Sequence, residues 1–258
     1  MDLRGLLLDL EGVLYEDDTP ISGVADAMGA LAASGLEIRY LTNTTTRPRQ
    51  AIVDRLTGMG FDLAAEHVFT PCIAAGRLLR RKNLTRIHLA AAPELAEDFS
   101  DVEFVDDDPE AIVVGDLYRA FDWDRLNALF RMMQQGAVLV ALHKNRYCRR
   151  DGEIALDLGP FVAALDYAAG TQAVIVGKPS GLFFDLALAG LGLDAQSVAM
   201  VGDDIEADIG GAAQAGMTTI QVKTGKFTLK DRDHPFIRPD HLIGSAAELP
   251  SLLLDRGK

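Results

Sequence analysis

Four short apolar runs in this chain each end directly in a reactive polar residue. Short apolar runs of this kind are consistent with buried strands, and parallel α/β sheets bind ligands just outside the carboxyl ends of their strands. The four groups are therefore expected to converge in one crevice. The runs and the residues that follow them are 6–8 before Asp9, 38–41 before Thr42 and Asn43, 174–176 before Gly177 and Lys178, and 198–201 before Gly202 and Asp203.

Strand patterns alternate with helical patterns along almost the whole chain. Such alternation favours a mostly parallel sheet with helices on both faces, so an α/β fold is expected. Two reactive segments precede a middle block that has its own strands and helices, and two follow it. The chain is therefore predicted to hold a core of residues 1–80 and 173–258 and an inserted α/β domain of residues 81–172.

Composition narrows the classes of partner. Of the 258 residues, 48% are hydrophobic, which is enough for a packed core, and the formal charge is −13. Nucleic acids and anionic membrane surfaces attract basic proteins, so neither is the expected partner. The apolar stretches are too short for a secretory signal or a bilayer span, and two cysteines do not make a disulfide framework. A cytoplasmic, reduced protein is expected.

The strand-end segments would gather several carboxylates in one crevice. Two like charges about 4 Å apart repel each other by about 4 kcal/mol at an effective dielectric constant of 20, and Lys178 offsets only one of them. A hard divalent cation with oxygen ligands would offset the remaining carboxylate repulsion, and magnesium (Mg2+) suits a site that also holds phosphate. The carboxylates in question are Asp9, Glu11, Asp203, Asp204 and Asp208.

Phosphate chemistry gives the first groups their roles. The Asp9 carboxylate would attack phosphorus and form an aspartyl-phosphate that water then hydrolyses. Because residues i and i+2 of an extended chain face the same side, Glu11 would lie beside Asp9 and act as general acid and base. Lys178 would neutralise the charge that spreads over the phosphoryl oxygens.

The remaining groups would hold the substrate and the cation. Thr42 and the backbone N–H groups near Asn43 would bind the phosphoryl oxygens. Asp203 would bind the cation beside the nucleophile, while Asp204 and Asp208 would orient the groups that hold it. Taken singly, each group is explained as well or better as a helix cap, a turn residue or an exposed lysine. Together, in this order and at strand ends, they favour a catalytic site.

The four segments resemble the four motifs of the haloacid dehalogenase superfamily, and the resemblance covers nearly the whole chain. The large insertion is similar to the α/β cap of the subgroup that contains the UMP phosphatase and 4-nitrophenylphosphatase-like proteins. Further segments resemble the phospholysine phosphohistidine inorganic pyrophosphate phosphatases and the domain-containing-protein-2 branch of haloacid dehalogenase-like hydrolases. The motifs are residues 9–14, 41–43, 178–179 and 202–208, and the further segments are 143–147, 159–161, 176–179 and 223–226.

This resemblance implies a magnesium-dependent phosphatase with a Rossmann-like, mostly parallel core and an inserted cap. It implies Asp9 as the nucleophile, with the side chains of Asp9 and Asp203 and the backbone carbonyl of Glu11 as magnesium ligands. The caps of relatives also suggest a homodimer. The residues implied as phosphate contacts are Thr42, Asn43 and Lys178.

Glu11 departs from the superfamily pattern, because most superfamily phosphatases carry Asp at this position as the general acid and base. Glutamate keeps the carboxyl group but is one methylene longer. The two similar branches generally have serine there, which indicates that an imperfect acid is tolerated. We hypothesise that this chain favours leaving groups that need little protonation, such as pyrophosphate or an aryl phosphate.

The sequence thus predicts a phosphohydrolase for a small phosphorylated compound, since a cap over the crevice would exclude folded phosphoproteins. A low-turnover regulatory or ligand-binding protein and a phosphotransferase stay open as alternatives. Elsewhere, Trp123 is expected in the core and a helix from about residue 206 to 215. Cys148 is expected as a surface thiol of the cap, or as one whose pKa basic neighbours lower. The basic stretch 144–150 is either a substrate contact or a solvated loop.

Overall fold

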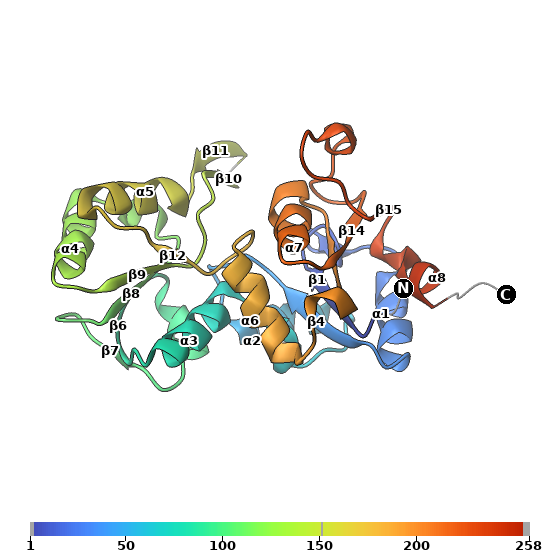
Figure 1. Ribbon diagram of the computed structural model, residues 1–258, viewed down its shortest axis with the longest axis horizontal. Helices are drawn as coiled ribbons and strands as arrows, with labels where there is room; N and C mark the ends of the chain where they lie inside the picture. The colour runs from blue at the N-terminus through green and yellow to red at the C-terminus, as the bar shows by residue number, and fades with distance from the viewer. Residues whose placement is uncertain (1–2, 151, 255–258) are drawn as a thin grey trace. The chain divides into compact units, whose positions relative to one another are not determined.

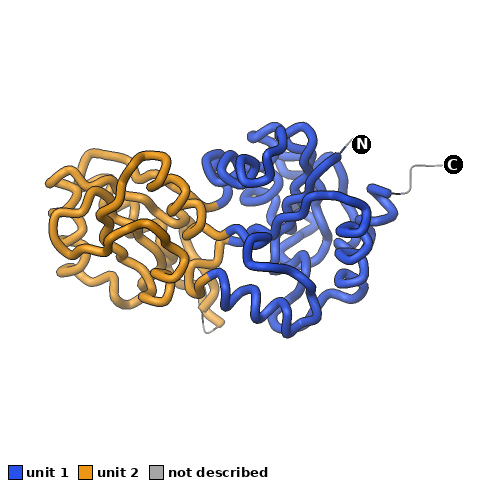
Figure 2. Tube along the Cα trace, turned by 90° about the horizontal axis from the view of Figure 1, so that it is seen from below, with its two compact units in different colours: residues 1–42, 49–69, 178–258 blue, residues 43–48, 70–177 orange. Residues whose placement is uncertain are grey.

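The computed structural model describes residues 3–150 and 152–254 and divides the chain into two compact units (Figures 1 and 2). The core unit holds residues 1–42, 49–69 and 178–258, and the inserted unit holds residues 43–48 and 70–177. The chain thus crosses between units after residues 42, 48, 69 and 177, whereas the sequence placed the crossings after residues 80 and 172. The roles of catalytic core and cap stay predictions.

A six-stranded parallel sheet runs through the core unit (Figure 1). Its central strand ends at Asp9, which pairs with Leu41 of the neighbouring strand. Because all neighbouring strands are parallel, their carboxyl ends lie along one edge of the sheet, and the predicted mostly parallel α/β fold is confirmed. In spatial order the strands are β15 (His241–Ile243), β14 (Thr218–Val222), β13 (Val198–Gly202), β1 (Gly5–Asp9), β4 (Glu37–Leu41) and β5 (Val68–Phe69).

Helices cover both faces of this sheet. Leu6 and Leu8 point to the same face and belong to one hydrophobic core with residues of α1, α2 and α8. Val68 joins that core, so its neighbour Phe69 points the other way, where its ring lies 5.1 Å from that of Phe183 in α6. The helices are α1 (Val24–Ala33), α2 (Arg49–Gly58), α6 (Gly181–Leu191), α7 (Gly211–Gln214) and α8 (Leu249–Leu253), and a short antiparallel pair is formed by β2 (Tyr15–Glu16) and β3 (Thr19–Pro20).

The inserted unit has a five-stranded parallel sheet of its own. Helices α4 and α5 pack on one face through Leu129, Val162 and Leu165, and α3 lies on the opposite face (Figure 1). In spatial order the strands are β12 (Val174–Ile175), β9 (Val138–Ala141), β8 (Ala111–Val114), β6 (Arg86–Ala90) and β7 (Glu103–Phe104). The helices are α3 (Pro71–Lys82), α4 (Trp123–Gln134) and α5 (Leu158–Ala169), and a separate hairpin joins β10 (Tyr147–Arg150) to β11 (Glu153–Leu156).

The prediction of a single helix from about residue 206 to 215 is wrong. Ile205–Gly210 forms a π-helical turn, and α7 follows it as a short α-helix. The backbone N–H groups of Asp208 and Ile209 both donate to the carbonyl of Asp204, at 3.0 and 3.2 Å, which widens the turn. Such wide turns are rare and are frequent at functional sites.

The expected core position of Trp123 is also wrong, because 73% of this residue is exposed. Trp123 is the first residue of α4, directly after the N-cap Asp122, whereas the buried residue of that helix is Leu129. The apolar face is covered only further along the helix, so its first turn projects beyond the core. Among the described residues, none of the helices has both the length and the apolar character that crossing a membrane requires.

The basic stretch 144–150 is partly neutralised and partly exposed. Lys144 Nζ lies 2.6 Å from Asp166 Oδ2, and Arg150 pairs with Asp116. Burial raises the pKa of the Cys148 thiol, and Arg150 lowers it less, so the option of an activated thiol is wrong. The two cysteines of the chain are free.

Candidate active site

Lys178 and two aspartates form buried ion pairs in the core unit. Lys178 Nζ lies 2.6 Å from Asp9 Oδ1, at the end of β1, and 2.7 Å from Asp208 Oδ1, in the π-helical turn. All three residues are buried, at 3%, 8% and 0% exposure. Burial lowers the pKa of Lys178, but Asp208 and Asp9 raise it further and keep it above its ordinary value, so the lysine is charged.

Asp203 follows β13 directly and uses its two carboxylate oxygens differently. Oδ2 accepts a hydrogen bond of 2.6 Å from the backbone N–H of Lys226, while Oδ1 is buried and has no hydrogen-bond partner among the described residues. Burial and the neighbouring Asp9 raise the pKa of Asp203 to about 6. Buried polar atoms are nearly always satisfied, so this oxygen points to a ligand that binds there.

The three buried aspartates fit a divalent cation. One oxygen from each of Asp9, Asp203 and Asp208 lies within 4.8 Å of the others. Burial, Asp9 and Asp203 raise the pKa of Asp208 to about 7 against the effect of Lys178. A single ammonium therefore does not balance the three carboxylates, and oxygen donors are the ligands that a hard cation prefers. The sequence predicted that Asp208 orients the groups that hold the cation. In the structure its carboxylate lies in the same cluster as those of Asp9 and Asp203.

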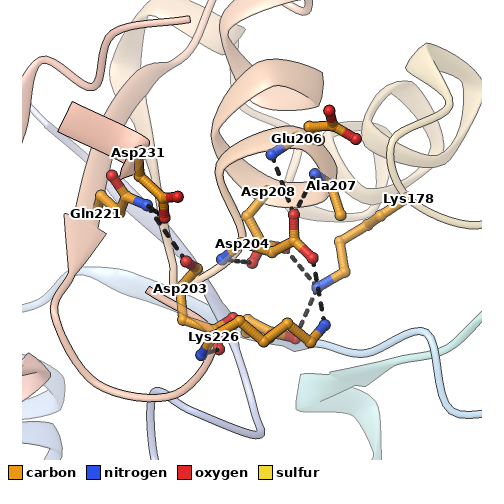
Figure 3. A network of polar contacts seen from close by, with 10 residues as sticks. Lys178, Asp203, Asp204, Glu206, Ala207, Asp208, Gln221, Lys226 and Asp231 are labelled. Atoms are coloured by element: carbon orange, nitrogen blue, oxygen red, sulfur yellow. Dashed lines mark hydrogen bonds and ion pairs between the residues drawn. The ribbon is translucent and has the colours of Figure 1, made fainter. Parts of the chain in front are cut away.

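The loop after β13 holds Asp208 through its neighbours. Asp204 Oδ1 caps the π-helical turn by accepting from the N–H groups of Glu206 and Ala207, at 3.0 and 2.9 Å (Figure 3). The N–H of Asp204 donates to Asp208 Oδ2 at 3.2 Å. A Cβ on Gly202 would lie 2.3 Å from Asp208 Cβ, so only glycine lets this aspartate approach the strand end.

The three other predicted site residues are Thr42, Asn43 and Glu11. Thr42 is buried at the end of β4, and its N–H donates to the carbonyl of Phe69 at 3.3 Å. Asn43 belongs to the inserted unit, where its Oδ1 would lie 3.0 Å from a Cβ on Gly177. Glu11 lies beyond the end of β1 and is exposed. The structure thus gathers five predicted residues, Asp9, Lys178, Asp203, Asp204 and Asp208, and the phosphate and acid–base roles of the other three stay predictions.

Residues 223–226 resemble relatives in sequence, but the sequence predicted no role for them in the site. Residues 224–226 are called the 224–226 loop here. The loop follows β14 and supplies the N–H of Lys226 to Asp203, while Thr224 Oγ1 donates to the carbonyl of Gly12. It lies beyond the carboxyl end of a strand in the same parallel sheet as β1 and β13. The rule that found the other four segments therefore points to the position of this loop, but not to the backbone contacts it makes.

Comparisons with known proteins agree with these features. The sequence matches the profile of haloacid dehalogenase-like hydrolases over residues 6–105 and a HAD-hydrolase-like profile over residues 175–249. It is 37% identical to the phospholysine phosphohistidine inorganic pyrophosphate phosphatase of Rattus norvegicus, with 98% of this chain and 94% of the relative aligned. It is 39% identical to the haloacid dehalogenase-like hydrolase domain-containing protein 2 of Bos taurus, with 90% and 88% aligned.

A solved structure shows the same fold. The p-nitrophenyl phosphatase from Archaeoglobus fulgidus superposes with a TM-score of 0.90 at 27% sequence identity, covering 98% of this chain and 100% of that chain. The predicted superfamily and the predicted class of enzyme are thereby confirmed. The chain belongs to the haloacid dehalogenase-like hydrolases, the family in which these relatives are phosphatases.

Proposed function

We propose that this chain is a Mg2+-dependent phosphohydrolase that cleaves a small phosphorylated compound through an aspartyl-phosphate on Asp9. The observation that carries the proposal is the buried Oδ1 of Asp203, which has no hydrogen-bond partner among the described residues and lies in one cluster with Asp9 and Asp208. Lys178 beside this cluster supplies the fixed positive charge that phosphoryl transfer requires.

In this proposal the site residues would have the following roles. Asp9 and Asp203 would hold the cation, which would supply charge neutralisation for the carboxylates and the phosphoryl group. Lys178 fixes one oxygen of Asp9, and the Asp9 carboxylate attacks phosphorus as the bond to the leaving group breaks. Water then attacks phosphorus, releases inorganic phosphate and restores the Asp9 carboxylate.

Relatives indicate the substrate class. The names of two of them refer to inorganic pyrophosphate, phospholysine and phosphohistidine, and to p-nitrophenyl phosphate. For this chain we propose a phosphomonoester, an aryl phosphate or pyrophosphate. A cytoplasmic location and a homodimer stay predictions.

A panel of substrates tests the proposal. Pyrophosphate, p-nitrophenyl phosphate and several alkyl phosphates are assayed with Mg2+, with EDTA, and with EDTA followed by excess Mg2+. We expect turnover of at least one compound, its loss in EDTA and its recovery with Mg2+. Binding without turnover across the panel would instead support a regulatory protein, and transfer to an added alcohol faster than hydrolysis would support a phosphotransferase.

The Glu11→Asp variant tests the leaving-group hypothesis. General acid–base catalysis contributes roughly 10²- to 10⁴-fold and matters most for alkoxide leaving groups. We expect kcat/KM for alkyl phosphates to rise by about tenfold relative to pyrophosphate and p-nitrophenyl phosphate. The exposed Glu66 of the core unit provides the matched control, Glu66→Asp, which leaves the ratio unchanged. An unchanged ratio in Glu11→Asp would refute the hypothesis.

A further inference from the structure

We infer that the 224–226 loop sets the cation affinity of the site, because it fixes one oxygen of Asp203 and leaves the other for the metal. This inference rests on the proposed Mg2+ site. It assigns a positioning role to Thr224, Gly225 and the backbone N–H of Lys226.

The Asp203 carboxylate is packed between two glycines. A Cβ on Gly12 would lie 2.2 Å from Asp203 Oδ2, and a Cβ on Gly225 would lie 2.1 Å from the same oxygen. Both glycines have positive φ values, +83° and +64°, which other residues adopt only at a cost. Any side chain at either position would therefore displace the carboxylate.

Hydrogen bonds complete the positioning of Asp203. The N–H of Lys226 donates to Oδ2 at 2.6 Å, and Gln221 Nε2 donates to the backbone carbonyl of Asp203 at 3.3 Å (Figure 3). Within the part of the chain that the structure describes, Asp203 Oδ1 is then left without a hydrogen-bond partner. A carboxylate held in this way presents one ligand atom at a fixed place, so little conformational freedom is lost when a cation binds.

The loop is itself anchored to the segment that follows the nucleophile. Thr224 Oγ1 donates to the carbonyl of Gly12, and the N–H of Gly225 donates to Glu16 Oε1 at 2.7 Å. Gly12 lies three residues after Asp9 in the chain. The 224–226 loop thus ties the position of Asp203, after β13, to the segment that follows Asp9, the last residue of β1.

The test is the affinity of the full chain for Mg2+, measured by isothermal titration calorimetry without substrate. Loss of a group that orients a metal ligand typically weakens binding by about 10- to 100-fold, and we expect a rise of that size in the Mg2+ dissociation constant of Gly225→Ala. Gly216→Ala is the matched control, because Gly216 has a φ of +80° and its Cβ would meet only Ala195 Cβ, at 4.0 Å. Its affinity should equal that of the wild type.

A second pair of variants covers the case in which Gly225→Ala does not fold. Thr224→Val loses the hydroxyl that reaches Gly12, and Thr224→Ser keeps it, so we expect weaker Mg2+ binding only in Thr224→Val. Circular dichroism without metal checks that each variant is folded. Wild-type affinity in folded Gly225→Ala and Thr224→Val would overturn the inference and leave the proposed function intact. A wild-type protein that binds no Mg2+ would overturn both.

Discussion

Replacing Asp9 with Asn is expected to lower kcat by at least about 10⁴-fold, the scale seen when a covalent nucleophile is removed. The amide keeps the shape of the side chain but is a poor nucleophile toward phosphorus. The protein should stay folded, because Lys178 still pairs with Asp208 at 2.7 Å and one of three crowded carboxylates has lost its charge. A loss of activity without loss of structure separates a nucleophile from a structural residue.

Steady-state kinetics on the best substrate of the panel measure this effect, and thermal unfolding reports on the fold. Asp26→Asn, at an exposed position of α1, is the matched control and should retain full activity. Activity of Asp9→Asn within tenfold of the wild type would exclude Asp9 as the nucleophile.

The Lys178→Met variant is expected to lose activity and also about 3–5 kcal/mol of unfolding free energy, the cost of removing one partner from a buried ion pair. Lys178 is 3% exposed and contacts Asp9 at 2.6 Å and Asp208 at 2.7 Å. Methionine fills similar space but leaves the carboxylates of Asp9 and Asp208 buried without the positive charge of the lysine ammonium. Saturating Mg2+ should restore part of this stability, because a ligand that binds only the folded state stabilises it.

Urea unfolding with and without Mg2+ measures the loss. Lys226→Met is the matched control, since the Lys226 side chain is 70% exposed and its ion pair with Asp204 spans 3.3 Å, and exposed pairs contribute about 0–1 kcal/mol. Adding Asp208→Asn to Lys178→Met should recover most of the stability but none of the activity. Equal losses in Lys178→Met and Lys226→Met would show that the buried ion pairs contribute little.

The regular part of the fold was predictable because buried parallel strands leave a plain pattern. The apolar runs 6–8, 38–41 and 198–201 were expected as strands and lie within β1, β4 and β13. Each combines an apolar run or face with clear flanking signals. Two-residue strands such as β5 are too short to produce such a pattern.

Other elements depend on contacts that the sequence does not display. The hairpin of β10 and β11 contains Arg149 and Arg150 among its strand residues, so its first strand was interpreted only as a basic stretch. The π-helical turn depends on two N–H groups that share one carbonyl, which no residue pattern specifies. Trp123 lies on the apolar side of a helical pattern but falls on a first turn that the core does not cover.

The candidate site also combines residues that the sequence predicted with contacts that only the structure shows. Reactive groups at strand ends identified Asp9, Lys178 and Asp203 in advance, and these residues do gather in one cluster with Asp208. The contribution of the 224–226 loop consists of a backbone N–H and of the space that a glycine leaves. Neither is visible as a chemical group in the sequence. That Asp203 Oδ1 has no hydrogen-bond partner among the residues described is evident only in three dimensions.

Trapping the phosphoryl group on the enzyme tests the central claim most directly. The full chain is mixed with Mg2+ and its best substrate, quenched in acid during turnover, digested and mapped by mass spectrometry. We predict a phosphoryl group on Asp9 that hydroxylamine removes, as expected for an acyl phosphate, and none in Asp9→Asn. A phosphoryl group on another residue, or turnover by Asp9→Asn at the wild-type rate, would contradict the account.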